Sequence, residues 1–325
     1  MSSPTPAPRR MRREVHGVLL LDKPTGISSN AALQTVKRLY QARKAGHSGS
    51  LDPLASGVLP ICLGEATKFS RFLLDSDKHY RVVCKLGERT RSGDAEGEVV
   101  ETRPVGAYSP QRLDEIAARF QGHLMQTPPM YSALKHHGQP LYRLARRGIE
   151  VERAPREVII RKLTLTLRAV DRLEMDVECS KGTYVRTLAE DIGEMLGCGA
   201  HLIELRRTRV GGFDVSQAHT LEALQSLAAQ GVEQLDGVLL PAEAALTGWP
   251  ELHLSETTAF YLGQGQAVFV PQAPSSGWVK LFAAGVQGGA RVAGDKTPGK
   301  PPRFLGVGEV QDDGRIAPRR LIQLS

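Results

Sequence analysis

Apolar and polar residues follow two periods along this chain, and segments of both kinds recur without a fixed order. Alternation of apolar and polar positions, as over residues 78–86, predicts a strand with one face in the core and one in water. Apolar residues three or four positions apart, as over residues 110–120, predict a helix with one buried face. These patterns predict strands over 17–22, 58–63, 78–86, 157–169, 173–179 and 201–210, and helices over 29–40, 66–74, 110–120 and 185–196.

The mixture of elements lacks the regular strand–helix–strand rhythm of a parallel α/β protein. We therefore expect an α+β fold with a mixed, mainly antiparallel sheet flanked by helices. From residue 251 the chain is Gly-rich and strand-like, and Asp313-Gly314 is typical of a hairpin turn. This predicts a larger domain over 15–249 and a small β-rich domain over 250–325, which contains a Gly-, Pro- and Lys-rich insertion at 285–302.

Composition narrows the functional classes. The chain has 325 residues with 42 Lys and Arg against 35 Asp and Glu, and a net charge of +7 suits a polyanionic partner. The four cysteines form no CxxC pair, so neither a zinc site nor a disulfide framework is indicated, and we expect a cytoplasmic protein. No apolar run approaches the roughly 20 residues of a membrane span. Residues 1–14 lack the apolar core of a secretory signal and predict a disordered basic tail.

The segment at residues 45–60, AGHSGSLDPLASGVLP, holds a single carboxylate, that of Asp52. Its glycines and Pro53 can fix the backbone so that this side chain is held at a set angle. The same residue types also make ordinary surface turns. Because the segment continues into the apolar run at 58–63, we expect Asp52 to lie beside a cleft.

Three motifs resemble the TruB family, the tRNA pseudouridine-55 synthases. They are GHSGSLDPLASGVLP around Asp52, KPTG at 23–26 and KGTYVR at 181–186, in the order that the family shows. The resemblance covers about residues 17–212. It implies a pseudouridine synthase fold with a small PUA-like RNA-binding domain at the C-terminus. It also implies isomerisation of uridine to pseudouridine in the T-loop of tRNA by base flipping, with no cofactor and no metal because the reaction gains and loses no atoms.

The resemblance also implies roles for individual residues. Asp52 is the expected nucleophile, and Arg186 is the cation that offsets the effect of burial on its pKa. Tyr80 matches a tyrosine that stacks on the target base near the proton lost from C5, although an inward strand tyrosine is commonly a core residue. The other matched positions are expected to bind substrate: His47, Tyr184, Leu205 and Lys23. Each has an ordinary alternative, such as surface for His47, core for Leu205 and an exposed strand end for Lys23.

The sequence departs from the family pattern at two positions, and one chemical step stays open. Ser48 and Ser50 stand where relatives often have Thr and Ala, which are small exchanges. The residues do not decide whether Asp52 attacks C1′ or C6, or removes the 2′ hydrogen.

Residues 126–156, called the thumb below, have a basic bias. Leu141 and Leu144 occupy one side of a short predicted helix, and Arg143, Arg146 and Arg147 the other. A solvated helix face explains such a pattern in most proteins. The resemblance implies instead an RNA-gripping insertion, with Arg146 and Arg147 as substrate-binding residues.

Other functions remain open. One is the catalytic subunit of a guide-RNA pseudouridylation complex, whose members lack the thumb. Another is a noncatalytic RNA-binding or tRNA-folding protein, against which the set of Asp52, Tyr80 and Arg186 argues. A glycosidase is disfavoured because the motifs supply no second acid. We expect tRNA as the partner of a monomer, with no membrane and no obligate protein partner.

Overall fold

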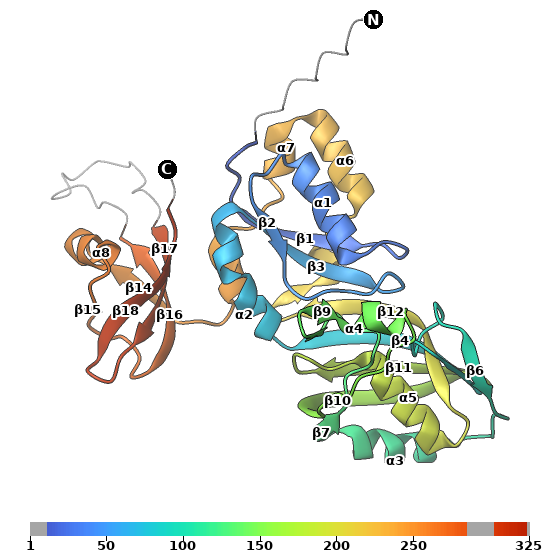
Figure 1. Cartoon of the computed structure of the whole chain (residues 1–325). Coiled ribbons are helices and arrows are strands. Elements are labelled where there is room, and N and C mark those ends of the chain that lie inside the picture. Colours follow the sequence, from blue (N-terminus) through green and yellow to red (C-terminus); the bar gives the residue numbers. More distant parts are fainter. Residues whose placement is uncertain (1–11, 285–301, 324–325) are drawn as a thin grey trace, which may run out of the picture.

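The computed structural model describes residues 12–284 and 302–323 (Figure 1). The predicted insertion at 285–302 therefore lies almost wholly outside the described residues, as do residues 1–11 of the predicted tail. The described residues include the last three of the predicted tail, 12–14. Arg13 forms a β-bridge with Ala42 and an ion pair with Asp236, and Glu14 pairs with Arg43 at 2.9 Å. These contacts hold Arg13 and Glu14 against the folded chain, so these two residues of the predicted tail are ordered.

A nine-stranded mixed sheet forms the centre of the larger part of the molecule. Its strands are β1 (Gly17–Lys23), β2 (Ala45–His47), β3 (Ser56–Leu63), β4 (Lys78–Leu86), β7 (Gly122–Gln126), β10 (Arg156–Ala169), β11 (Arg172–Cys179), β12 (Ala200–Val210) and β13 (Phe213–Asp214). The main order is β1-β3-β12-β4-β11-β10-β7, and only the β12–β3 pair among these is parallel. The predicted α+β class with a mainly antiparallel mixed sheet is confirmed.

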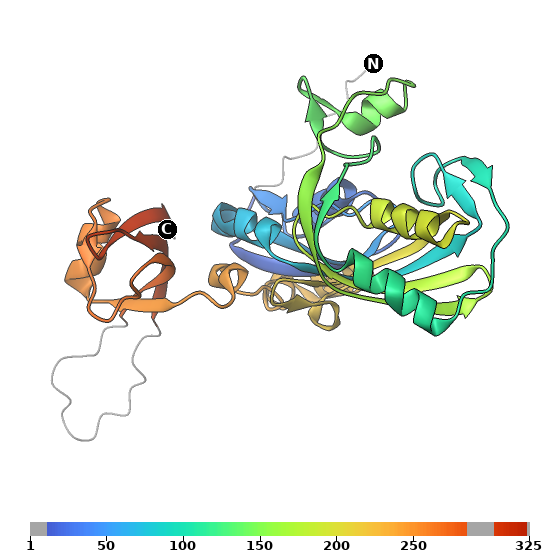
Figure 2. The ribbon, with the colours of Figure 1, turned by 90° about the horizontal axis from the view of Figure 1, so that it is seen from below.

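Helices cover the sheet, and their positions follow the apolar periodicity. The helices of the described residues are α1 (Ser29–Leu39), α2 (Ser70–Asp75), α3 (Pro110–Phe120), α4 (Leu141–Ala145), α5 (Val185–Leu196), α6 (Leu221–Gln230), α7 (Val232–Asp236) and α8 (Glu256–Gly263), with 3-10 turns η1 (Gly64–Phe69), η2 (Val215–Gln217) and η3 (Ala242–Leu246). Figure 2 shows α3 and α5 side by side on one face of the sheet. The apolar residues of α1, α3, α5 and α6 pack with the inward residues of the strands in one core.

A second core lies against the other face of β1 and β3 and reaches the C-terminal part of the chain. Phe69 and Leu73 pack there with Phe282 and Phe304, and the Phe69 and Phe304 rings are 5.5 Å apart. The single helix predicted over 66–74 is wrong in detail. Its first part is the 3-10 turn η1 and only its second part is the α-helix α2.

The C-terminal part contains a separate five-stranded sheet with α8 beside it. Its strands are β14 (Glu251–Leu254), β15 (Val268–Phe269), β16 (Gly277–Ala283), β17 (Arg303–Val310) and β18 (Arg315–Leu321), in the order β14-β16-β17-β18-β15. The predicted turn at Asp313-Gly314 joins β17 to β18, and Gly314 has a φ of 79° there. In the described ranges, no helix is long and apolar enough to cross a membrane.

Two small hairpins project from the large sheet. They are β5 (Glu88–Thr90) with β6 (Val99–Thr102), and β8 (Lys135–His136) with β9 (Gln139–Pro140). The second hairpin and α4 make up the outer part of the thumb, which stands away from the sheet in Figure 2.

Candidate active site

The loop that carries Asp52 joins β2 to β3 and is fastened on both sides of this residue. The Ser29 hydroxyl donates to the Leu51 carbonyl oxygen (2.9 Å) and accepts from the Leu51 amide (2.7 Å). The Gly26 amide donates to the Pro53 carbonyl oxygen at 2.8 Å. Leu51 is buried, whereas the Asp52 side chain is 42% exposed. The loop therefore enters the core and presents its carboxylate at an open edge.

Arg186 lies in the first turn of α5 and forms an ion pair with this carboxylate. Its Nη2 is 3.0 Å from Oδ2 of Asp52, although the Arg186 side chain is only 6% exposed. Nη1 donates to the Ser92 carbonyl oxygen (2.9 Å) and Nη2 to that of Tyr131 (2.7 Å). Nη1 is also 3.6 Å from the buried carboxylate of Asp94. Acceptors from three segments thus fix the guanidinium before any substrate arrives.

The charges around Asp52 act against each other. Burial raises the pKa of its carboxyl, the Arg186 charge lowers it, the Asp94 charge raises it and the Lys23 charge lowers it. The balance leaves the pKa above its ordinary value. The ionised form that a nucleophile needs therefore depends on Arg186 and Lys23.

Lys23 ends β1 and has no exposed surface. Its ammonium donates to the carbonyl oxygens of Pro24 and Ile27, both at 2.7 Å. Burial lowers its pKa to about 8, while the Asp52 charge opposes this effect. The alternative interpretation of Lys23 as an exposed lysine at the end of a strand is therefore wrong.

Tyr80 and Leu205 lie on adjacent strands next to the Asp52 loop. Tyr80 on β4 is partly buried, and Leu205 on β12 is buried opposite Val82. Burial raises the pKa of the Tyr80 hydroxyl, the Arg207 charge opposes the rise and the Asp52 charge adds to it. The structure therefore brings Tyr80 within electrostatic range of Asp52.

Tyr184 and His47 flank this group. The Tyr184 amide donates to Oε1 of Gln126 at 2.8 Å, and Nε2 of Gln126 donates back to the Tyr184 carbonyl oxygen at 3.1 Å. His47 on β2 is partly buried, and its Nδ1 has no hydrogen-bond partner among the described residues. Burial lowers the pKa of His47, and the Arg207 charge lowers it further. Tyr184 is within electrostatic range of Asp52 and Arg186, and His47 of Arg207.

The sequence analysis missed two charged residues of this site. Asp94 lies in the loop after β5 and contacts Arg186, but nothing in the motif SGDAEG distinguishes it from a surface acid. Arg207 is 1% exposed and donates to the carbonyl oxygens of Val58 (Nε, 2.9 Å) and Gly49 (Nη2, 3.1 Å). A signal existed for Arg207: neighbouring residues of a strand point to opposite faces, so Arg206 and Arg207 cannot both face water.

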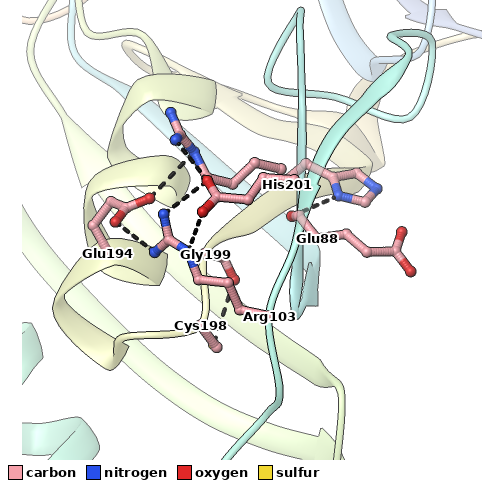
Figure 3. Close-up of polar contacts among 8 residues, drawn as sticks. Glu88, Arg103, Glu194, Cys198, Gly199 and His201 are labelled. Atoms are coloured by element: carbon pink, nitrogen blue, oxygen red, sulfur yellow. Dashed lines mark hydrogen bonds and ion pairs between the residues drawn. The ribbon is translucent and has the colours of Figure 1, made fainter.

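A network of ion pairs ties the β5–β6 hairpin to the end of α5 (Figure 3). Arg103 contacts Glu194 at 2.8 Å and Glu101 at 2.7 Å, and Arg89 contacts both acids at 3.2 and 3.1 Å. Close by, Nδ1 of His201 donates to the Glu88 carbonyl oxygen (3.1 Å). The network holds the hairpin whose loop supplies Ser92 and Asp94 to Arg186.

The base of the thumb contacts the site through Tyr131, whose carbonyl oxygen accepts from Arg186, whereas the thumb arginines lie on its outer part. Leu141 and Leu144 of α4 are buried as predicted, while Arg143, Arg146 and Arg147 are exposed. The Arg146 guanidinium lies 5.7 Å from the centre of the Tyr142 ring. Across the described ranges, no ion pair joins Arg146 or Arg147 to an acidic residue. These two arginines therefore present free charge at the surface.

The site offers oxygen and nitrogen atoms, but they are not arranged to bind a metal ion. Among residues 12–284 and 302–323, no group of three His, Cys, Asp or Glu side chains is placed to hold a metal ion. Cys62, Cys84, Cys179 and Cys198 are all buried free thiols.

Comparison with known families and relatives gives a consistent result over nearly the whole chain. Residues 37–185 match the TruB family pseudouridylate synthase N-terminal domain, and residues 186–247 match the tRNA pseudouridylate synthase B C-terminal domain. Residues 250–287 and 285–322 match a domain described as pseudouridine synthase II TruB, C-terminal. A protein named tRNA pseudouridine synthase B from Nitrosococcus oceani is 56% identical over 95% of this chain and 96% of its own length. The protein of the same name from Stutzerimonas stutzeri is 53% identical over 97% and 98%.

Solved structures share the fold at lower identity. A chain of a Cbf5-Nop10-Gar1 complex superposes with a TM-score of 0.69 and 24% identity, over 95% of this chain and 84% of that one. A chain of an H/ACA RNP bound to a substrate RNA gives the same TM-score at 21% identity, over 95% and 86%.

Proposed function

The chain belongs to the TruB family of pseudouridylate synthases, and we propose on that premise that it isomerises uridine 55 in the T-loop of tRNA to pseudouridine. The ion pair between Asp52 and Arg186, at 3.0 Å, is the observation that carries the proposal. It supplies one carboxylate at the open edge of a buried network, which is what a reaction at a flipped nucleoside needs. The relatives named tRNA pseudouridine synthase B support tRNA as the substrate.

The reaction is an isomerisation whose bonds and protons balance. The C1′–N1 bond of uridine breaks and its electron pair leaves with the base. The base turns, C5 bonds to C1′, the C5 proton is lost and N1 takes up a proton. Asp52 is the nucleophile, whose covalent bond to the nucleoside forms and breaks again within one turnover, so its carboxylate is regenerated. Arg186 keeps this carboxylate ionised despite the burial that raises its pKa.

The remaining site residues bind the nucleoside. Tyr80 stacks on the flipped base and lies close to the proton that C5 loses. Base–aromatic stacking suits the partly buried position of Tyr80 beside the Asp52 loop. Its neighbours in the site hold the nucleotides around the flipped uridine: Lys23, His47, Tyr184 and Leu205.

The thumb and the C-terminal part hold the rest of the RNA. Arg146 and Arg147 bind backbone phosphates, a role that their exposure and lack of acidic partners in the described chain support. The five-stranded sheet after residue 250 acts as an RNA-binding domain, separate from the catalytic domain at 15–249. We further propose that the protein acts as a cytoplasmic monomer without an obligate protein partner.

The relatives favour a stand-alone enzyme over a subunit of a guide-RNA complex. Identity above 50% over nearly the full length joins this chain to proteins named tRNA pseudouridine synthase B. The chains from the Cbf5 and H/ACA structures are 21–24% identical and share the fold. The proposal therefore requires activity without a guide RNA or a second protein.

One assay tests the proposal directly. The full chain is mixed with a tRNA transcript that carries tritium at C5 of its uridines, and released tritium is counted without any other protein or RNA. We expect release of one tritium per tRNA and a pseudouridine at position 55. A transcript with cytidine at position 55 is the matched control and should release none. Equal release from both transcripts, or none from either, would contradict the proposal.

A further inference from the structure

Arg207 is a buried cation without an acidic partner. It is the largest side chain among those with less than 2% exposure in the described chain. Its guanidinium donates to two backbone carbonyl oxygens, those of Val58 and Gly49. Within residues 12–284 and 302–323, no carboxylate lies at ion-pair distance from it. Burial of a charge without an opposite charge costs folding free energy. Such a charge is therefore a candidate for a functional role.

The fold holds this guanidinium in one place. The β12 backbone at Arg207 lies beside Gly57 of β3, where a Cβ atom would come within 2.1 Å of the Arg207 carbonyl oxygen. Gly57 has a φ of 106°, which also favours glycine. The close contact of the two strands lets the Arg207 side chain bond to Val58 and, across the loop, to Gly49. Arg207 thus joins the sheet to the Asp52 loop.

Tyr80 is the residue directly opposite Arg207 on β4. Directly opposed residues of antiparallel strands point to the same face with their Cβ atoms about 4.5–5.5 Å apart. The Arg207 charge lowers the pKa of the Tyr80 hydroxyl, against the burial that raises it. A guanidinium has five N–H donors, and the carbonyls of Val58 and Gly49 use two of them. Donors remain for the Tyr80 oxygen.

We propose that Arg207 is a positioning residue that holds the Tyr80 hydroxyl and stabilises its phenolate while Tyr80 takes the proton from C5. The inference rests on the proposed function, since it names the residue that supports Tyr80 in that reaction. In this step the C5–H bond breaks and its electron pair closes the C5=C6 double bond, while the C6=N1 pair moves to N1. N1 takes up the proton that the phenol releases, and the phenolate oxygen receives the C5 proton, so Tyr80 ends as it began.

The charge of Arg207 acts on other groups besides Tyr80. Burial lowers the pKa values of Lys23 and Lys78, and the Arg207 charge lowers both further. Both ammonium groups therefore lose their charge more readily than an ordinary lysine as the pH rises through about 8. The guanidinium stays charged at any pH of interest and so provides a permanent cation beside Tyr80.

A titration that needs no RNA tests the inference. In the full chain, 3-fluorotyrosine is placed at position 80 and its ¹⁹F resonance is followed with pH in wild type, Arg207→Lys and Arg207→Gln. We expect Arg207→Gln to raise the phenol pKa by about 1 or more, and Arg207→Lys by about 0.5 or less, because lysine keeps the charge. Arg206→Gln is the matched control: Arg206 is next in sequence, pairs with Asp22 at 2.7 Å and should leave the phenol unchanged. The same phenol pKa in all four proteins would overturn the inference.

Single-turnover kinetics separate this role from a merely structural one. Arg207→Gln should slow tritium release by about 10–100-fold at saturating enzyme, and it should slow it no further in a Tyr80→Phe background. Equal losses in both backgrounds would mean that Arg207 only supports the loop, and the inference would fail. If Arg207→Gln does not fold, Arg207→Lys is compared with wild type in the same two backgrounds. The fluorotyrosine titration is independent of activity, so a failure of the proposed reaction does not imitate a failure here.

Discussion

Two groups of arginines in this molecule stand in opposite environments. Arg186 and Arg207 are 6% and 1% exposed and donate to carbonyl oxygens that fix their direction. Arg146 and Arg147 of the thumb are exposed, and in the described ranges they have no acidic partner. A fixed cation sets the charge at one point, which is what a reacting carboxylate or phenolate needs. A free surface cation can follow a phosphate backbone, and this suits binding.

The two regions also differ in how much their charged groups reduce the stability of the folded state. In the group around Asp52, here called the Asp52 centre (Lys23, Asp52, Tyr80, Arg186 and Arg207), burial raises the pKa of Asp52 and lowers that of Lys23 to about 8. Both changes disfavour the charged form in the folded state. The Asp52 centre therefore keeps charged groups in place at some cost in stability, whereas the thumb arginines keep their contact with water.

Removal of the carboxylate of the Asp52 centre should have the largest effect on turnover. Asp52→Asn keeps the shape of the side chain and loses the nucleophile, so turnover should fall by at least about a thousandfold. Arg186 retains Asp94 and the carbonyl oxygens of Ser92 and Tyr131, so the loss in stability should stay below about 3 kcal/mol. A thermal melt checks that the variant is folded before the rate is read. Turnover within about tenfold of wild type would remove Asp52 from the mechanism.

Tyr80 should give the next largest effect, because it serves the Asp52 centre through both its ring and its hydroxyl. Tyr80→Phe keeps the stacking face and loses the proton acceptor, so the rate should fall by about 10²–10⁴. Tyr80→Leu removes the ring as well and should be nearly inactive. A rate within tenfold of wild type for Tyr80→Phe would show that stacking alone matters. Normal turnover of Tyr80→Leu would make Tyr80 a core residue.

The thumb should respond to substitution in binding rather than in chemistry. Replacing Arg146 and Arg147 with alanine should weaken tRNA binding by about tenfold at physiological salt and reduce the slope of log K against log salt by about one to two. Arg119→Ala is the matched control, since Arg119 is an exposed arginine on α3 away from the thumb. Titrations at several salt concentrations measure the slope. A slope equal to that of the control would mean that the thumb arginines do not touch phosphates.

The smallest effect on turnover, and a clear effect on stability, is expected at Glu190. Burial raises the pKa of its carboxyl to about 7, with Arg89 and Arg186 opposing and Asp191 and Asp94 adding to the rise. A raised pKa means that its contribution to stability is present below about pH 4.5 and is lost as the pH rises through about 7. Glu190→Gln should therefore be more stable than wild type by about 1–3 kcal/mol at pH 8 and by less at pH 5. Denaturant melts at both pH values measure this, and an equal difference at both would contradict the assignment.

Much of the fold follows from local patterns in the sequence. Helix α5 spans Val185–Leu196 and ends at Gly197, as the apolar spacing and the glycine predict. The strands β4 and β11 follow the alternation of their residues. The break between η1 and α2 could not be predicted, because Phe69 and Leu73 are positioned by packing against the C-terminal part, not by local preference.

The site was only partly visible in the sequence. The motifs around Asp52 and Arg186 give both partners of the ion pair, because each lies in a run of residues that the family resemblance covers. Asp94 could not be assigned, since a loop acid reaches the site only through the folding of distant segments. For Arg207, strand alternation indicates that one of Arg206 and Arg207 faces inward, but its place beside the Asp52 loop depends on the pairing of β12 with β3 and β4. Lys23 was placed near the site, but its complete burial comes from the turn that wraps its ammonium in carbonyl groups.

The most direct test of the account compares the two regions in one experiment. Tritium release from C5-labelled tRNA is followed in single turnover, at saturating enzyme, for Asp52→Asn and for the double variant of Arg146 and Arg147, and tRNA affinity is measured for both. The account predicts that Asp52→Asn binds tRNA within about threefold of wild type and releases tritium at least about a thousandfold more slowly. It predicts the reverse for the double variant, with weaker binding and a rate within about threefold of wild type once saturated. A folded, tRNA-binding Asp52→Asn protein that releases tritium at a rate close to that of wild type would contradict the account.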